Sequence, residues 1–142
     1  PGNLGTILRA ADAAGASAVI VTANSVDPYA PKVVRATTGS LFHVDIAVGA
    51  STLDAVEAAA AAGLSVLAAD VTGEDLVALQ AEGVLARPTA WLFGNEARGL
   101  DAATLALADR AVRLPVYGRA ESLNLATAAS VCLYQSAFAQ RS

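Results

Sequence analysis

Residues 114–124 read Leu-Pro-Val-Tyr-Gly-Arg-Ala-Glu-Ser-Leu-Asn, and no other stretch is as informative about the architecture of this chain. The apolar residues 111–114 predict a short strand, and the Ala-rich residues 125–139 predict a long helix. Pro115 and Gly118 interrupt regular structure between these two elements. The stretch therefore predicts a strand, a tight loop and a helix start.

Two other loops of the same kind lie upstream. Residues 1–5 read Pro-Gly-Asn-Leu-Gly and are followed by Arg9, and residues 93–100 read Phe-Gly-Asn-Glu-Ala-Arg-Gly-Leu. Each of the three segments combines glycine with polar side chains next to an apolar strand or helix. This recurrence favours one composite site over three unrelated turns.

The remaining sequence alternates between predicted strands and helices. Leu4, Ile7, Leu8, Ala11 and Ala14 form one apolar stripe, with Gly15 as a stop signal. Predicted helices cover residues 3–14, 31–37, 52–62, 102–108 (with Asp101 as N-cap) and 125–139; predicted strands cover 18–22, 42–48, 64–69, 89–93 and 111–114; residues 71–88 are ambiguous. Because the strands are continuous apolar runs, we expect an α/β fold with a mostly parallel sheet and helices on both faces.

Composition limits the class of protein. The chain has 142 residues, of which 55% are hydrophobic and 5% aromatic, so the core must consist mainly of Ala, Val and Leu. No apolar run has the ~20 residues of a membrane span, and no signal segment opens the chain, so a cytoplasmic location is expected. The single Cys132 is expected to be a small buried hydrophobe, and one His with one Cys makes a structural zinc site improbable.

Since the chain starts without Met and directly on a motif, we expect residues 1–142 to be a C-terminal fragment of a longer protein.

Charge is unevenly distributed along the sequence. The net charge is −4, yet residues 36–86 hold seven acids and no Lys or Arg, while the rest holds all nine bases against six acids. A basic active face on an acidic body is one interpretation, and solvated charges scattered over the surface are the other.

The polar residues of the three segments each have a plain structural alternative. Gly94 follows a predicted strand at its carboxyl end, where α/β proteins bind ligands, but Gly94 and Gly99 are also ordinary turn residues. Arg9 faces away from the apolar stripe and could anchor a phosphate, or be a surface partner of Asp12. Asn3, Ser122 and Asn124 are equally candidates for helix caps.

Other nucleotide and catalytic signatures are missing. The sequence has neither G-x-G-x-x-G nor a Walker lysine loop, and Asp70 has no glycine fingerprint at the required distance before it. A Rossmann-type oxidoreductase is therefore disfavoured. His43 stands alone in a predicted strand and is expected to be structural.

Together the three segments resemble the SpoU (TrmH-like) RNA ribose 2′-O-methyltransferases of the SPOUT superfamily over essentially the whole chain. The matching patterns are Asn3-x-Gly5-x-x-x-Arg9-x-Ala11 for motif 1, Phe93-Gly94-Asn95-Glu96-x-x-Gly99-Leu100 for motif 2, and Leu114-Pro115 through Ser122-Leu123-Asn124 for motif 3. Motifs 2 and 3 in combination are highly specific.

The resemblance implies features that the pattern alone does not contain. It implies a deep trefoil knot at the C-terminal end, which general rules of chain topology would have excluded. It implies S-adenosylmethionine as cofactor, held largely by main-chain groups and without a metal. The implied cofactor-binding residues are Phe93, Gly94, Leu114, Val116, Gly118, Leu123 and Asn124. It also implies an RNA substrate, with rRNA favoured over tRNA, and a homodimer formed through the knot region and the closing helix.

The implied catalytic residues are Arg9, Asn3, Glu96, Ser122 and Asn124. The family assigns activation of the ribose hydroxyl to Arg9, but a guanidinium has a pKa above ~12 and is a poor base. We therefore expect Arg9 to position a phosphate and stabilise alkoxide charge, while Glu96, Ser122 and Asn124 organise the pocket.

A catalytically silent SPOUT-like module for RNA binding or assembly is the alternative. The presence of Asn3, Arg9, Glu96 and Asn124 argues against it. The strand that usually precedes motif 1 and an N-terminal RNA-binding domain are not found in the sequence, which leaves the choice of RNA open.

Overall fold

A computed structural model of the chain describes residues 2–23, 25, 27–40, 43–94 and 99–141. Its helices are α1 (Gly2–Ala14), α2 (Pro31–Thr37), α3 (Thr52–Ala61), α4 (Leu76–Ala81), the short 3-10 helix η2 (Val84–Ala86), α5 (Ala102–Leu107) and α6 (Leu125–Gln140). Its strands are β1 (Ala18–Val21), β2 (Asp45–Val48), β3 (Ser65–Asp75), β4 (Thr89–Leu92) and β5 (Arg110–Arg113). The predicted alternation of strands and helices is confirmed.

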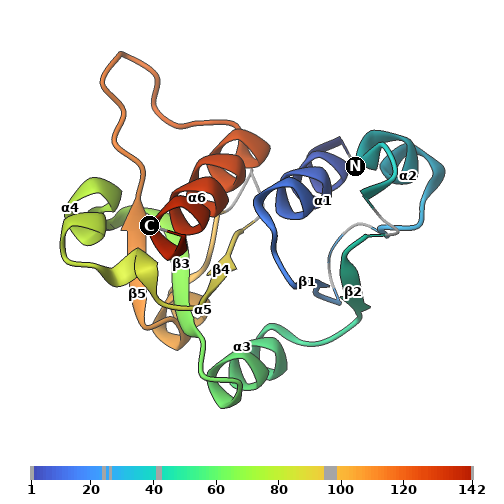
Figure 1. The fold of residues 1–142 in the computed structure, drawn as a ribbon, viewed down its shortest axis with the longest axis horizontal. Coiled ribbons are helices and arrows are strands. Elements are labelled where there is room, and N and C mark those ends of the chain that lie inside the picture. Colours follow the sequence, from blue (N-terminus) through green and yellow to red (C-terminus); the bar gives the residue numbers. More distant parts are fainter. Residues whose placement is uncertain (1, 24, 26, 41–42, 95–98, 142) are drawn as a thin grey trace.

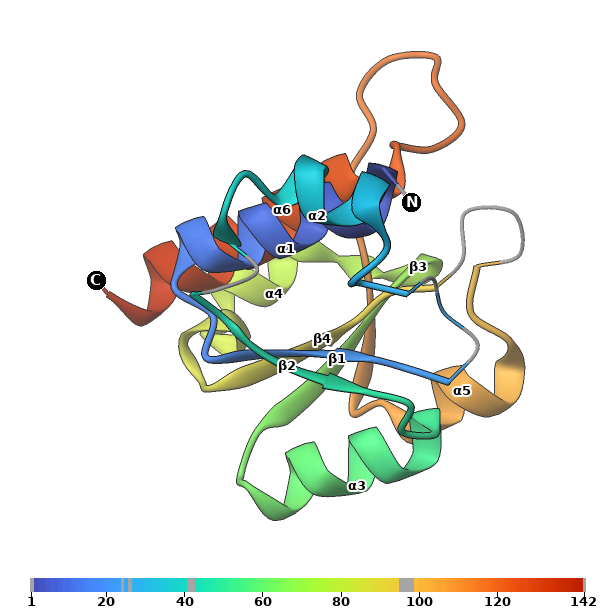
Figure 2. The same cartoon turned by 90° about the vertical axis from the view of Figure 1, so that its right-hand side faces the viewer.

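All the strand pairs are parallel. Among the described residues, β1 and β2 form a two-stranded sheet, and β3 lies between β4 and β5 in a separate three-stranded sheet, so the expectation of one sheet is wrong. Figure 2 shows α1, α2 and α6 on one side of the strands and α3 with α5 on the other. The α/β class, the parallel pairing and the helices on both faces are thus confirmed.

The strands differ in how deeply they are buried. Val66, Leu67 and Ala68 of β3 are buried, but Ile20 of β1 and Val48 of β2 are about half exposed, at 43% and 52%. The continuous apolar run at residues 18–22 therefore does not form a fully buried strand. The reason is that α3 packs mainly against β3 and α5, so the outer pair of strands is less covered than the central strand.

Two groups of apolar side chains hold the elements together. The stripe on α1 is confirmed, since Leu8 and Ala11 are buried where α1 packs on α2 and α6. The second group surrounds the central strand and consists of Leu67, Leu76, Leu79, Leu85 and Val112, with Trp91 and Leu114 packed against it. This second group, called the core cluster below, connects three strands to α4 and η2.

β3 continues beyond its predicted end at residue 69. Both Ala69 and Glu74 pair with Val112, so residues 70–73 form an insertion in the strand. A Cβ on Gly73 would lie 2.5 Å from the backbone of Ala111, so the insertion lies close to β5. The ambiguous region 71–88 then forms α4, whose first turn is capped by the Asp75 carboxylate, and η2.

β5 is the last strand in the order β4-β3-β5 and begins and ends with arginine. Arg110 pairs with Glu82 at 3.2 Å and with Glu74 at 3.6 Å, and Arg113 pairs with Asp75 at 3.8 Å. These arginines therefore face acidic groups of the same chain. No helix in the described part of the chain is both long and apolar enough to cross a membrane.

Candidate functional site

The carboxyl ends of the strands and the start of α1 lie at one end of the molecule. Figure 2 shows the N-terminal end of α1, the end of β4 and the long connection from β5 to α6 on the same side, away from the C-terminus. Ligands of open α/β sheets bind at the carboxyl ends of the strands. The structure therefore brings the three sequence motifs to one end, as the composite site requires.

The connection after β4 begins with Phe93 and Gly94, both partly buried. A Cβ on Gly94 would lie 2.5 Å from the carbonyl carbon of Gly99 and 2.8 Å from the amide nitrogen of Leu100. Residue 94 must therefore be glycine because the two ends of this connection are in direct backbone contact. Gly99 has a φ of +62°, a conformation that suits glycine. Glu96 lies outside the described residues.

The connection after β5 begins at Leu114 and then projects outward from the molecule, as Figure 1 shows. Leu114 packs against the core cluster. Val116 and Leu123 are each 40% exposed, and no atom lies near the position of a Cβ on Gly118. Between residues 115 and 123 no main-chain group hydrogen-bonds to the backbone of another described residue.

Asn124 is the N-cap of α6. Its side-chain oxygen accepts hydrogen bonds from the amides of Ala126 at 2.9 Å and Thr127 at 3.3 Å. The capping interpretation of Asn124 is therefore confirmed, whereas the exposed Ser122 is not the cap. Asn124 fixes the place where the long connection joins α6.

Motif 1 is helical, so the expectation of a polar loop at residues 1–5 is wrong. α1 begins at Gly2, which places Asn3 inside the first turn and not at the cap. Gly5 lies against α2, because a Cβ there would be 2.3 Å from the Cβ of Ala36. The glycine of motif 1 thus permits close helix packing, and Arg9 is exposed as predicted.

Arg9 does not pair with Asp12. The Asp12 carboxylate is 3.0 Å from Nδ1 of His43. The prediction that His43 lies inside a strand is wrong, because His43 precedes β2. Hydrogen bonds from His43 and then Ser40 lower the pKa of Asp12. Arg9 on α1 and Lys32 and Arg35 on α2 make no ion pair with a described residue.

Cys132 is fully buried on α6, as predicted, and burial raises the pKa of its thiol to about 12. Within the described ranges, no group of three or more His, Cys, Asp or Glu side chains could hold a metal ion.

Two residues that support the site were not recognised from the sequence. Trp91, two positions before Phe93 and Gly94, donates a hydrogen bond from Nε1 to the hydroxyl of Ser136 on α6 at 2.9 Å. The rings of Trp91 and Phe93 stack with centroids 6.3 Å apart. A lone tryptophan in a strand was the available signal, since a buried indole N–H needs a partner.

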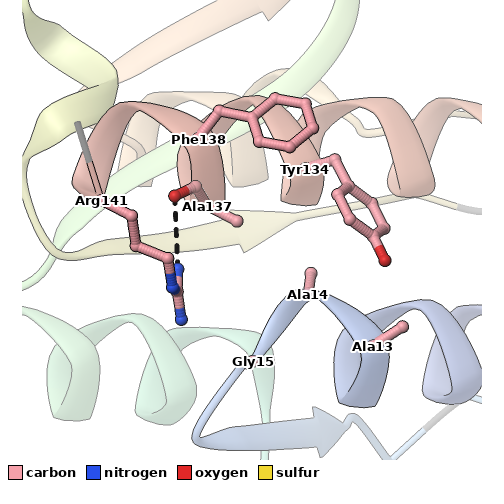
Figure 3. A pocket seen from close by; sticks show the side chains of 7 residues that line it. All are labelled: Ala13, Ala14, Gly15, Tyr134, Ala137, Phe138 and Arg141. Atoms are coloured by element: carbon pink, nitrogen blue, oxygen red, sulfur yellow. Dashed lines mark hydrogen bonds between the residues drawn. The ribbon is translucent and has the colours of Figure 1, made fainter.

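A shallow groove of about 480 Å³ lies between the C-terminal parts of α1 and α6. It is lined by Ala13, Ala14, Gly15, Tyr134, Ala137, Phe138 and Arg141. Figure 3 shows Tyr134 reaching toward the alanines of α1, and Arg141 donates to the carbonyl of Ala137 at 3.3 Å. The groove is remote from the carboxyl ends of the strands, so it is separate from the candidate site (Figure 2).

Comparison with known proteins gives consistent matches over the chain. Residues 1–134 match the model of the SpoU rRNA Methylase family. A 23S rRNA (uridine(2479)-2′-O)-methyltransferase of Streptomyces viridochromogenes is 41% identical, over 96% of this chain and 48% of the relative. The 23S rRNA (guanosine(2553)-2′-O)-methyltransferase RlmP of Bacillus subtilis is 38% identical, over 94% of this chain and 52% of the relative.

A solved structure agrees with the sequence matches. The SpoU methyltransferase AviRb of Streptomyces viridochromogenes, in complex with the cofactor AdoMet, superposes with a TM-score of 0.85 and 41% identity, over 99% of this chain and 56% of that protein. The chain thus spans about half the length of the relatives it matches. With its three motifs gathered at one end of a parallel α/β fold, this chain belongs to the SpoU rRNA Methylase family.

Proposed function

We propose that this chain is the catalytic domain of an RNA ribose 2′-O-methyltransferase that uses S-adenosylmethionine. The main support is that the start of α1, the end of β4 and the connection 114–124 lie together at the carboxyl ends of the strands, with Arg9 exposed on α1. The family relationship covers the same residues, and the relative AviRb was solved with AdoMet. The named 23S rRNA enzymes among the relatives favour rRNA over tRNA.

The residues present suit a cofactor held by main-chain groups. The connection 115–123 has no backbone hydrogen bonds to described residues, so its N–H and C=O groups can serve a ligand. Leu114, Val116 and Leu123 offer apolar surface, and Gly118 offers open space beside the backbone. Phe93 and Gly94 would form the opposite wall, and Asn124 would border the pocket at the start of α6.

Catalysis then depends on Arg9 and the polar residues of the motifs. The cofactor, when bound, supplies an electrophilic methyl group for attack by a ribose 2′-hydroxyl. The guanidinium of Arg9 would hold a phosphate and stabilise negative charge on the attacking oxygen. Asn3, Glu96 and Ser122 orient the nucleotide, with Asn3 on the same helix as Arg9.

An RNA-binding surface is supported by the charges of α1 and α2. Arg9, Lys32 and Arg35 are exposed, and none is neutralised by a described acid. By contrast, Arg110 and Arg113 face acids from the acidic part of the sequence. The basic groups near the site would thus attract an RNA backbone while the acidic body does not.

We also propose a homodimer formed through α6 and α1. One face of α6 is buried in the domain through Ala126, Ala129, Cys132 and Ser136. The other face exposes Val131, Tyr134 and Phe138, at 36%, 38% and 59%. Twofold pairing would remove this apolar surface from water. Light scattering at micromolar concentration should give twice the protomer mass, and a monomer in an active preparation would contradict it.

Three further features follow from the family relationship as proposals. Residues 1–142 would be the methyltransferase domain of a protein with the length of its relatives. The connection 114–124 and α6 would form the trefoil knot. The reduced, buried Cys132 suits a cytoplasmic location.

The decisive experiment is methyl transfer from labelled cofactor to separated rRNA and tRNA, followed by mapping of the modified nucleotide. Label on one ribose of rRNA supports the proposal. Label on tRNA alone would correct the substrate. Binding of RNA without binding of cofactor would instead identify a silent RNA-binding module.

A further inference from the structure

Trp91 on β4 is anchored to α6 by a hydrogen bond between side chains far apart in the sequence. Its Nε1 donates to the hydroxyl oxygen of Ser136 at 2.9 Å. Ser136 is only 6% exposed, and Trp91 also packs against the core cluster. A buried hydroxyl and an indole N–H satisfy each other here, so both side chains have one preferred orientation.

The ring of Trp91 is in turn stacked on the ring of Phe93. The two rings have an interplanar angle of 17° and a centroid separation of 6.3 Å. Residues 91 and 93 project to the same side of the chain, because alternate side chains of an extended segment share a face. Phe93 immediately precedes Gly94, where the connection from β4 begins.

We infer that Ser136 and Trp91 are positioning residues that hold Phe93 in place as one wall of the adenosyl pocket. The inference rests on the proposed function, since Phe93 is a proposed cofactor-binding residue. α6 provides a rigid base for this arrangement because Ala129 and Cys132 are fully buried. The orientation of Phe93 is thereby set from α6, a helix distant in the sequence.

The test is binding of S-adenosylhomocysteine, measured by calorimetry on the full-length protein. Ser136→Ala removes the acceptor, and Trp91→Leu removes the stacking ring. Each should weaken binding between about 2-fold and 10-fold, the range expected for loss of one aromatic pair. Trp91→Phe also removes the hydrogen bond to Ser136, so it should weaken binding about as much as Ser136→Ala, although a ring remains beside Phe93.

A matched control and a double variant separate positioning from general damage. Ser130→Ala removes another α6 hydroxyl, which among the described residues bonds only to the carbonyl of Ala126 in its own helix, and should leave binding unchanged. In Trp91→Phe there is no indole N–H, so adding Ser136→Ala should produce no further loss. Thermal unfolding of every variant identifies any that fail to fold; Ser136→Ala and Trp91→Phe, the milder changes, keep the test valid if Trp91→Leu fails.

Fluorescence provides a second readout that does not need the ligand. The emission of the protein minus that of Trp91→Phe isolates Trp91, and this difference should shift to the red in Ser136→Ala and stay unchanged in Ser130→Ala. Equal binding by Ser136→Ala and the original protein, or the same loss from Ser136→Ala in both Trp91 backgrounds, would overturn the inference. No binding by the unmodified protein would refute the proposed function itself.

Discussion

Nδ1 of His43 lies 3.0 Å from the carboxylate of Asp12, which ties the C-terminal part of α1 to the turn before β2. The two residues are 31 positions apart, and no pattern in the sequence pairs them. The Asp12 carboxylate also bonds with Ser40, which is buried. One acid thus holds the segment between α2 and β2 against α1.

This pair predicts a dependence of stability on pH. Hydrogen bonds from His43 and Ser40 place the folded-state pKa of Asp12 below its ordinary value of 3.8. The carboxylate therefore stabilises the fold above about pH 4, and this contribution is lost as the pH falls through the folded-state pKa. Thermal unfolding of the original protein and Asp12→Asn between pH 2.5 and 7 should show a gap near neutrality that closes in acid.

Asp45→Asn is the control for this prediction, because Asp45 is exposed and makes no side-chain bond within the described chain. It should follow the original protein at every pH. A gap between Asp12→Asn and the original protein that persists unchanged at the acid end would show that the Asp12 carboxylate is not its source.

Asn124→Ala should lower the free energy of unfolding by about 1 kcal/mol, because the amides of Ala126 and Thr127 lose their cap. Asn124→Asp keeps the capping oxygen and should restore this stability. Because Asn124→Asp replaces the amide with a charged carboxylate beside the proposed pocket, it should still bind cofactor more weakly. Denaturant unfolding and calorimetry measure the two effects separately, and equal stability of all three proteins would exclude the capping role.

Gly94→Ala should destabilise the fold, because its Cβ would lie 2.5 Å from the backbone of Gly99. Residues 94 and 99 would then have to move apart, so the backbone contact between the two ends of this connection would be lost. Gly118→Ala is the matched change, since nothing lies within 4 Å of its Cβ position. Its melting temperature should stay close to that of the original protein. Equal melting temperatures for both variants would contradict the contact at Gly94.

Arg9→Ala should reduce methyl transfer by about 10²–10³, the usual loss when one donor to a developing charge is removed. Because Arg9 is exposed and makes no ion pair with a described residue, stability should change by less than about 0.5 kcal/mol. Arg87→Ala removes an arginine that precedes β4, at the opposite end of that strand from Gly94, and should stay active. Steady-state rates on the RNA substrate decide the matter: a fully active Arg9→Ala enzyme would refute the assigned role.

The fold class could be predicted because it depends on local patterns. The stripe on α1 and the cap of α5 by Asp101, whose pKa is lowered chiefly by a hydrogen bond with Thr104, depend on residues close in sequence. The extension of β3 could not be predicted, because residues 70–73 are an insertion defined only by pairing with Val112 of β5.

The candidate site, like the fold, could be predicted only where it depends on local sequence patterns. The motifs identified its segments, but the roles of their glycines required the tertiary structure. Gly5 and Gly94 are needed where two parts of the chain touch, at α2 and at Gly99, and not at loop positions open to a ligand. Likewise, the bond from Trp91 to Ser136 spans 45 residues, so only the packed structure reveals it.

The arginines at the two ends of β5 have a consequence for behaviour in concentrated solution. An unpaired strand edge is a template on which another chain can add a strand, and natural proteins protect such edges with charge and by keeping them short. β5 is four residues long, and Arg110 and Arg113 are partly exposed beside their acidic partners. Ion pairs of this exposed kind add little to folding stability. Their benefit lies in solubility, because an incoming strand would have to displace hydrated charges at both ends of the edge before forming a single hydrogen bond.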